Sequence, residues 1–358
     1  MAAQLPLTSS LSQVLVALTI EADNEYEHRA PHFTTDHKVG ALGRGPWLIS
    51  TAMYVNFLRF VPDDGIPMRD LAAMSGADEP VHPAYHGMRR WGYVTYTPDI
   101  AGSAPRAKDG DALVGLTPAG ARARALWEQT LADVERSWAD RGLAALRRSL
   151  IQVAESVDTK LPEYLPVVGF DYRTPRLHEP VSREPSELGL LALLAQTLLA
   201  LTIEYEAAEP LSLTTAQGLL RPLRDGPTRV ADLTEVSGIA KKAWSSAAGQ
   251  LERSGHLATE PGPGGRGKAV RLTDNGAAVV DASNSRLASI DAGWRKRDTS
   301  VDALRGELEK IVGDGTPSSP VFAGMEPYPE CWRAKLKPLR VLPHQPLVSH
   351  RGGYPDGS

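Results

Sequence analysis

Apolar positions recur with helical spacing over most of the chain, and short alternating stretches interrupt them near residues 95, 115, 258 and 270. In the first half this pattern predicts, in chain order, helices over 11–29, 46–61, 68–74 and 79–91, strands at YVTYT and ALVGLT, and a long closing helix. The closing helix is expected to begin at Thr117, a favoured N-cap residue, with Pro118 at its first position. The Ser-Gly pair after residue 74 predicts a tight turn between two helices, the spacing of a helix-turn-helix.

The same series returns in the second half. VLVALTIE at 14–21 recurs as TLLALTIE at 197–204, and four further matches follow in the same order: RDLAAMSG with ADLTEVSG, MRRWGYV with LERSGHL, LTPAG with LTDNG, and LRRSL with LRGEL. Trp138 pairs with Trp294 in this alignment. The second series predicts helices over 188–208, 214–223, 230–236 and 240–254, strands at HLATEP and AVRLT, and a closing helix that begins at Thr273.

We therefore predict two copies of one domain, a first copy at 1–180 and a second copy at 186–312, joined through the proline-rich stretch 175–185. Residues 313–358 form a Pro/Gly-rich C-terminal arm that still carries many apolar residues, and it is expected to lie across the body between the copies. The predicted fold is mainly α with small β wings: two tandem winged helix-turn-helix domains flanked by long helices. With 358 residues, two hydrophobic cores are the first expectation.

Composition narrows the class of protein. The single cysteine, Cys331, excludes an intrachain disulfide framework, and the longest apolar stretch, Leu188–Leu201, is too short to cross a bilayer. No leader is apparent at the N-terminus, so a cytoplasmic protein without membrane contact is expected. A net charge of −4 excludes a general coat of positive charge, but it leaves room for a local basic surface.

The stretch 262–276, GPGGRGKAVRLTDNG, provides such a surface. Its part RGKAVRLTDNG resembles the R-A-K-x-V-x-L-T-x-x-G pattern of the MarR family of bacterial transcriptional regulators, and LTPAG in the first copy matches the second half of that pattern. An aspartate that the family usually carries ahead of the wing arginine is Gly264 here. The resemblance implies a regulator that binds double-stranded operator DNA, whose terminal helices form a dimer interface and which can respond to a small-molecule effector. Two copies in one chain then imply an internal pseudo-dimer, present as a monomer or as a homodimer.

The residue types in the second copy fit DNA binding. A guanidinium on a glycine-rich tip can enter a minor groove, which suits Arg266, while Lys268 and Arg271 suit the phosphate backbone. On the helix over 240–254, lysines suit phosphates, and serine and glutamine can contact base edges: Lys241, Lys242, Ser245, Ser246 and Gln250. Trp244 is expected in the core rather than on DNA. Further basic residues at Arg286, Arg295, Lys296 and Arg297 are expected to extend the basic surface; a solvated hairpin with ordinary surface charges is the alternative.

The first copy is less basic at the matching positions. Asp78 and Glu79 begin its predicted recognition helix, which contains Pro80 and Pro83, and Gly110 between two aspartates occupies the place of Arg266. Arg106 and Lys108 lie a few residues earlier and are candidates for a shifted wing tip. His82, Tyr85 and His86 are candidates for base contacts. We expect this copy to bind DNA weakly or to act as a scaffold.

Other candidate chemistry is weaker. The acidic and histidine-rich segment from Glu21 to His37 has residue types that bind zinc, but Pro31 breaks the spacing of His28 and His32, and a solvated helix end is favoured. A structural role is favoured over oxidant sensing for Cys331. Four aromatic residues are candidates to line an effector pocket, although core packing is favoured for them: Tyr26, Trp47, Tyr54 and Phe57. No catalytic motif is present, so neither an enzyme nor a cofactor is expected. The alternative function is a winged-helix protein that has lost DNA binding and serves as a ligand-binding or protein-interaction module.

Overall fold

The structure is a computed structural model, which describes residues 5–30, 48–75, 88–98, 110–156, 161, 163, 183–335 and 339–346. The described part of the first copy contains, in chain order, α1 (Leu7–Arg29), α3 (Thr51–Asn56), β1 (Ile66–Pro67), α4 (Met68–Ser75), β2 (Val94–Thr97), β3 (Leu113–Leu116), α6 (Pro118–Ser137) and α7 (Leu143–Ser156). The helix predicted over 46–61 is shorter than expected. It ends at Asn56, because Phe57 leaves the helical region with φ −143°, and a 3₁₀ turn over Leu58–Phe60 follows.

The second copy repeats this order. Its elements are α8 (Leu190–Glu206), a π-helical segment η5 (Thr214–Leu220), β4 (Thr228–Arg229), α9 (Leu233–Ser237), α10 (Lys241–Arg253), β5 (Leu257–Pro261), β6 (Lys268–Leu272), α11 (Asp274–Arg297) and α12 (Ser300–Val312). The helix predicted over 214–223 is π-helical and then 3₁₀, with Pro222, which has no N–H to donate, inside the 3₁₀ turn Arg221–Leu223. The fold is thus mainly helical with two small sheets, as predicted.

Each copy has a three-stranded antiparallel sheet, where two strands were predicted. The orders are β1-β3-β2 and β4-β6-β5, so the same strand is central in both copies. The extra strands, β1 and β4, are two residues long and precede α4 and α9. They pair with the central strand through Ile66 opposite Val114 and Thr228 opposite Val270. A run of two residues has no detectable alternation, which is why the pattern of the sequence did not show it.

The closing helices begin as predicted. Thr117 accepts a hydrogen bond from the N–H of Gly120 (3.0 Å), and Thr273 accepts one from Gly276 (3.1 Å). A Cβ on Gly120 would lie 2.0 Å from the carbonyl oxygen of Tyr93, just before β2, and one on Gly276 would lie 2.2 Å from that of His256, just before β5. The LT-x-x-G motif therefore caps the helix and lets it pack closely on the sheet.

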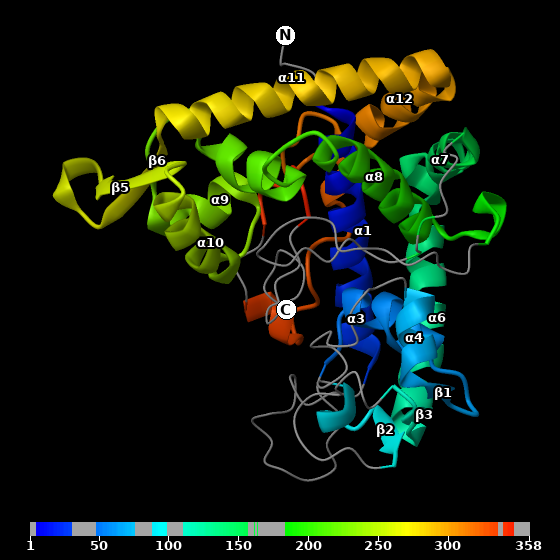
Figure 1. Cartoon of the computed structure of the whole chain (residues 1–358). Helices are drawn as coiled ribbons and strands as arrows, with labels where there is room; N and C mark the ends of the chain where they lie inside the picture. Colours follow the sequence, from blue (N-terminus) through cyan, green and yellow to red (C-terminus); the bar gives the residue numbers. More distant parts are fainter. Residues whose placement is uncertain are drawn as a thin grey trace.

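The long helices of the two copies share one central body (Figure 1). α1 packs against α8, α7 packs against α12, and each copy's first helix also packs against the last helix of the other copy. α8 is apolar on nearly every face because it lies among α1, α7 and α11. One hydrophobic core accordingly joins both copies, and a second, smaller core of the described residues lies inside the second copy between Leu219 and Val280. The expectation of one separate core for each copy is therefore wrong: the larger core is shared by both copies, and the smaller one belongs to the second copy.

The repeated ALTIE motif has the same contacts in both copies. Glu21, at its end in α1, accepts a hydrogen bond from the indole N–H of Trp138 (2.8 Å) and pairs with Arg141 (2.7 Å). Glu204, at its end in α8, accepts from the indole of Trp294 (2.8 Å) and pairs with Arg297 (2.8 Å). Sequence positions that align are therefore also equivalent in their bonding.

The C-terminal arm crosses between the copies. Its described residues contact α1 through Asn24, which donates to the carbonyl of Met325 (3.0 Å), and through Ser12, which donates to the carbonyl of Pro343 (2.9 Å). On the second copy, Gln345 donates to Thr202 of α8 (3.4 Å). Figure 1 shows the arm in orange and red beside α1. Among the described residues, none of the helices is long and apolar enough to cross a membrane.

Candidate nucleic-acid interface and cavity

The segment for which a helix-turn-helix was predicted in the second copy contains α9 and α10. Gly238 makes the turn between them with φ +68°, a backbone conformation that favours glycine. Trp244 of α10 points inward: it is 2% exposed, and its indole N–H donates to Ser237 Oγ at the end of α9 (2.7 Å). Trp244 thus joins the two helices from the core, as expected, and the opposite face of α10 is exposed.

The exposed face of α10 carries part of the predicted DNA-binding set. Lys241, Ser245 and Gln250 are exposed, and Ser245 Oγ donates back to the carbonyl of Lys241 (2.9 Å). The side chains of Lys242 and Ser246 lie outside the described residues. Glu252 is also exposed on α10 and accepts a hydrogen bond from the N–H of Thr259. The face is therefore polar and mixed in charge, with its lysine at the N-terminal end.

The wing tip between β5 and β6 depends on glycine. Gly264, Gly265 and Gly267 all have positive φ, and a Cβ on Gly262 would lie 2.3 Å from the carbonyl oxygen of Arg266. Arg266 and Lys268 are exposed on this tip and form no ion pair with any described residue. Figure 1 shows the β5–β6 hairpin projecting from the left edge of the molecule. The geometry thus presents two exposed cations, without an ion-pair partner among the described residues, on a narrow loop.

Two parts of the predicted basic surface are not free for DNA: Arg271 is paired within the hairpin, and the basic residues of α11 lie far from the wing. Arg271 is held by Glu260 across the hairpin (2.9 Å) and donates to the carbonyl of Leu272. The expectation that the basic residues of α11 extend the wing surface is wrong, because residues 295–297 lie roughly 30 Å along the helix axis from its start. Arg295 pairs with Asp302, and Arg286 and Arg297 donate to Glu204, so these side chains hold the long helices together.

In the first copy, the predicted contacts with DNA lie mostly outside the described residues. These are Arg106 and Lys108 of the shifted wing tip, and Asp78, Glu79, Pro80, His82, Pro83, Tyr85 and His86 of the recognition segment. In the described part, Asp111 is exposed beside Gly110 and pairs with Arg69, at the start of α4. At the base of the first wing, the charge of Asp111 is thus balanced by Arg69. At the tip of the second wing, Arg266 and Lys268 have no such partner among the described residues.

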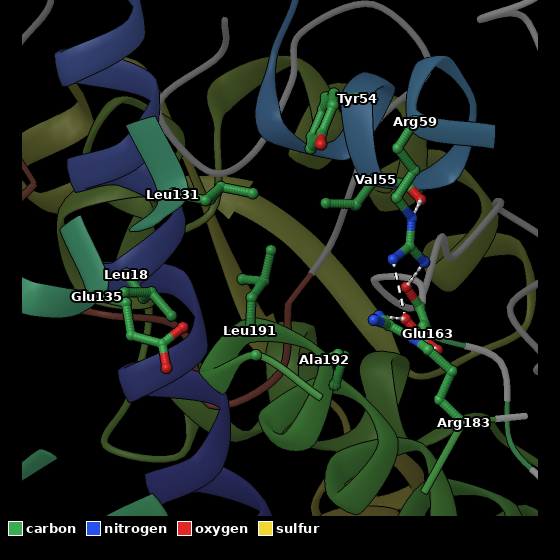
Figure 2. A pocket seen from close by; sticks show the side chains of 12 residues that line it. Leu18, Tyr54, Val55, Arg59, Leu131, Glu135, Glu163, Arg183, Leu191 and Ala192 are labelled. Carbon is green, nitrogen blue, oxygen red and sulfur yellow. Dashed lines mark hydrogen bonds and ion pairs between the residues drawn. The ribbon is translucent and has the colours of Figure 1, made fainter. Parts of the chain in front are cut away.

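A cavity of about 170 Å³, partly open to solvent, lies between the copies (Figure 2). Leu18 of α1, Val55 of α3, Leu131 of α6 and the α8 residues Leu191, Ala192 and Ala195 form its apolar walls. Of the four aromatic residues proposed for an effector pocket, Tyr54 lines this cavity. Tyr26 and Phe57 are core residues instead, and Trp47 lies outside the described residues. Tyr26 stacks on Trp127, with ring centroids 4.0 Å apart, which explains its burial.

Three charged residues form one edge of the cavity, and the sequence analysis did not identify them. Glu163 pairs with Arg59 (3.0 Å) and with Arg183, whose Nε donates to it at 2.8 Å. Burial opposes ionisation of Glu163, but Arg183 and Arg59 together hold its pKa below the usual range. Figure 2 shows both guanidinium groups directed at this carboxylate. Two cations thus face one anion at this edge, and Glu135 is a further charged residue among the lining residues of a mostly apolar cavity. A mostly apolar space with a few polar groups suits a small ligand.

The acidic end of α1 is not the solvated helix end that was expected. Asp23 and Glu27 are each 2% exposed because the C-terminal arm covers them. Arg333 of the arm lies 3.1 Å from Asp23 and 3.7 Å from Glu27, and Asp23 also accepts from the N–H and hydroxyl of Thr51. Burial raises the pKa of both carboxyl groups against the opposing effect of Arg333. Glu21, Glu25 and His28 are not among the residues that line the cavity.

The arm also brings His28 of α1 beside Glu330 and Cys331. The sequence analysis treated these residues separately because about 300 positions separate His28 from the other two, and no pattern along the chain connects them. Burial, together with Glu27 and Glu330, raises the pKa of the Cys331 thiol to about 11. A thiol that stays protonated at neutral pH is a poor oxidant sensor, which supports the choice of a structural role over a redox one.

Comparison of the chain with protein-family models, with curated proteins and with solved structures found no significant match.

Proposed function

We propose that this protein is a DNA-binding transcriptional regulator of the MarR type, in which one chain takes the place of a dimer. The observation that carries the proposal is the wing tip of the second copy, where Arg266 and Lys268 are exposed beside the exposed face of α10 and form no ion pair with a residue that the structure describes. Free cations on a loop and an adjacent helix face together provide phosphate contacts and side chains for base edges. The proposed partner is therefore duplex DNA.

The bonding of the two copies supports the pseudo-dimer in this proposal. The reciprocal packing of α1 with α12 and of α8 with α7 is what an exchange of terminal helices between two subunits produces, here within one chain. Because the first wing differs in charge from the second, we propose that the operator is asymmetric and that the second copy contributes most of the binding energy.

Selection from a pool of randomised duplexes tests this proposal without knowledge of the operator. The expected result is enrichment of one sequence, which the protein then binds with an affinity that falls steeply as salt increases. Arg266→Ala combined with Lys268→Ala is expected to weaken binding to all sequences and to lower the salt slope by roughly 2, about 0.9 for each lost phosphate contact. Arg136→Ala with Lys296→Ala is the matched control: it removes the same charge from exposed sites on the long helices.

A failure of the selection to enrich any sequence, with equal salt slopes in both double variants, would contradict the proposal. It would favour the second candidate, a ligand-binding module that has lost DNA binding. The cavity beside Tyr54 is the observation that favours this candidate, and a small-molecule effector held there is compatible with both functions. Replacing Ala192, which lines the cavity, with Phe would fill it and is expected to abolish ligand binding while leaving the wing intact.

A further inference from the structure

Three metal-ligating side chains meet where the C-terminal arm crosses the end of α1. His28 comes from the last turn of α1, and Glu330 and Cys331 come from the arm. One donor atom from each of the three residues lies within 4.8 Å of the other two. His28 Nδ1 and Glu330 Oε1 are 2.7 Å apart, a hydrogen-bond distance. Imidazole nitrogen, thiolate sulfur and carboxylate oxygen are together a zinc ligand set.

The surrounding contacts hold these side chains in place. The ring of Tyr328 stacks on the ring of His28, with centroids 3.8 Å apart and planes at 10°, and its hydroxyl donates to Glu25 on the same helix. The N–H of Cys331 donates to the carbonyl of Tyr328 (2.9 Å), and the N–H of Trp332 donates to Glu27 (2.6 Å). The turn that carries Glu330 and Cys331 is thus fixed to α1 on both sides, which limits the reorganisation that a metal ion would require.

The site is open to an ion from solvent. The side chains of His28 and Glu330 are 42% and 57% exposed, whereas Cys331 is buried beneath them. Ligands of a tetrahedral zinc ion lie about 2.0–2.3 Å from the metal, which places them roughly 3.3–3.7 Å from each other. An entering ion would replace the hydrogen bond between His28 Nδ1 and Glu330 Oε1. The distance between these two atoms would increase by less than about 1 Å, and the sulfur of Cys331 would move toward them.

The neighbouring carboxylates do not compete for the ion. Asp23 and Glu27 lie deeper under the arm and are already compensated by Arg333. Glu25 is engaged by Arg29 and by Tyr328. Among the described residues, only His28, Glu330 and Cys331 bring a histidine, a cysteine and a carboxylate together.

We propose that His28, Glu330 and Cys331 bind Zn²⁺ and that the ion clamps the C-terminal arm to α1. The protein supplies three ligands, and water takes the fourth position of the tetrahedron. Binding exchanges the thiol proton of Cys331 for the metal, and the proton leaves to solvent. The clamp lies at the start of the segment that continues to residues 339–346, which pack against Gly238 in the turn between α9 and α10. The proposal does not depend on DNA binding.

Cobalt titration of the full chain, reduced and freed of metal with a chelator, tests the site directly. Because Cys331 is the only cysteine, a thiolate-to-cobalt charge-transfer band can arise from no other residue. We expect this band to saturate at one equivalent of Co²⁺ and to disappear when Zn²⁺ is added. Cys331→Ser is expected to remove the band, and His28→Gln and Glu330→Gln are each expected to weaken binding by more than the ~10–100-fold that loss of an outer-shell partner costs.

The controls separate the site from general metal binding and from misfolding. His28 and Glu330 are on the surface, so their variants are expected to keep the far-ultraviolet circular dichroism of the parent protein, and His256→Gln, at the second sheet, is expected to bind cobalt like the parent. Absence of the band in the parent protein would overturn the proposal. So would a band that persists unchanged in both His28→Gln and Glu330→Gln, because the sulfur would then bind metal without the other two ligands.

Discussion

The helices α1 and α8 share the ALTIE motif but differ in the residues that follow it. In both, the glutamate of ALTIE bonds to a tryptophan indole and to an arginine three residues further on. After that point α1 continues to Arg29, whereas α8 ends at Glu206. The extra turns of α1 carry Glu27 and His28, and the C-terminal arm covers Glu27 together with Asp23, which lies at the position of Glu206 in α8. The repeat thus determines the bonding common to both copies, and the arm adds the features that only the first copy has.

The difference is measurable at the shared glutamate. The side chain of Glu21 is 8% exposed and that of its partner Arg141 13%, whereas Glu204 and Arg297 are 35% and 61% exposed. Gly324 of the arm lies directly on Glu21, with φ +82° and no room for a Cβ. Two ion pairs with the same partners are therefore expected to differ in their contribution to stability, because water screens one and is excluded from the other.

Glu21→Gln and Glu204→Gln provide the largest test of this comparison. Glu21→Gln leaves the guanidinium of Arg141 buried without its counterion, which is expected to lower the free energy of unfolding by about 3–5 kcal/mol. Glu204→Gln removes a screened pair and is expected to cost about 1 kcal/mol or less. Urea unfolding followed by circular dichroism measures both changes. Equal losses would show that the arm does not exclude water from Glu21.

Gly324→Ala tests the contact of the arm without changing a charge. A Cβ at residue 324 would lie 2.4 Å from Glu21 Cδ, so the substitution must move either the arm or the carboxylate, and it also strains a backbone with positive φ. We expect a loss of about 2–3 kcal/mol. Gly92→Ala is the matched control because Gly92 has φ +81° with nothing within 4 Å of the added Cβ. Its cost is then the backbone strain alone, about 1–2 kcal/mol.

Equal unfolding midpoints for Gly324→Ala and Gly92→Ala would mean that the arm moves away from Glu21 without cost. In that case the arm would contribute little to the burial of the end of α1.

Local patterns predicted most of the fold and part of the site. The caps at Thr117 and Thr273, the core position of Trp244 and the order of elements all depend on residues within a few positions of each other, where helix periodicity and capping rules act. The exposed glycine-rich tip at Arg266 was also evident from its local sequence, GPGGRGK at 262–268. These features need no knowledge of which distant segments meet.

The remaining features depend on contacts between distant segments. The burial of Asp23 by Arg333, the charged edge of the cavity at Glu163, and the meeting of His28 with Cys331 join positions about 100–310 residues apart. The segment from Glu21 to His28 contains as many charges as a solvated helix end, and nothing in it indicates that the arm returns to cover it. A single sequence contains no signal for such pairings, because neither periodicity nor turn chemistry extends over that range.

One end of the C-terminal arm is held by ion pairs and the other by a buried neutral histidine, so the two ends are expected to respond differently to pH. This is the smallest of the expected effects. At the first copy, Asp23 and Glu27 form ion pairs with Arg333 of the arm. At the second copy, the partly buried His344 of the arm lies near Arg221. Burial and, secondarily, Arg221 lower the pKa of His344 to about 3, so the folded state holds the imidazole neutral, whereas the unfolded chain protonates near pH 6.5. Stability from this contact is therefore complete above about pH 6.5 and declines as the pH falls toward 3.

Hydrogen exchange of the two arm segments measures this difference. Between pH 7 and pH 5, after correction for the intrinsic exchange rate, opening of 339–346 is expected to increase about 25-fold, equivalent to about 1.9 kcal/mol. Opening of 325–335 is not expected to increase, because the raised pKa values of Asp23 and Glu27 mean that acid does not weaken the folded state there. His344→Gln is expected to remove the pH dependence of the first segment, because glutamine does not titrate. If both segments opened together at pH 5, the arm would behave as one cooperative unit, and acid would release the first copy's carboxylates and the second copy's turn at Gly238 in a single step.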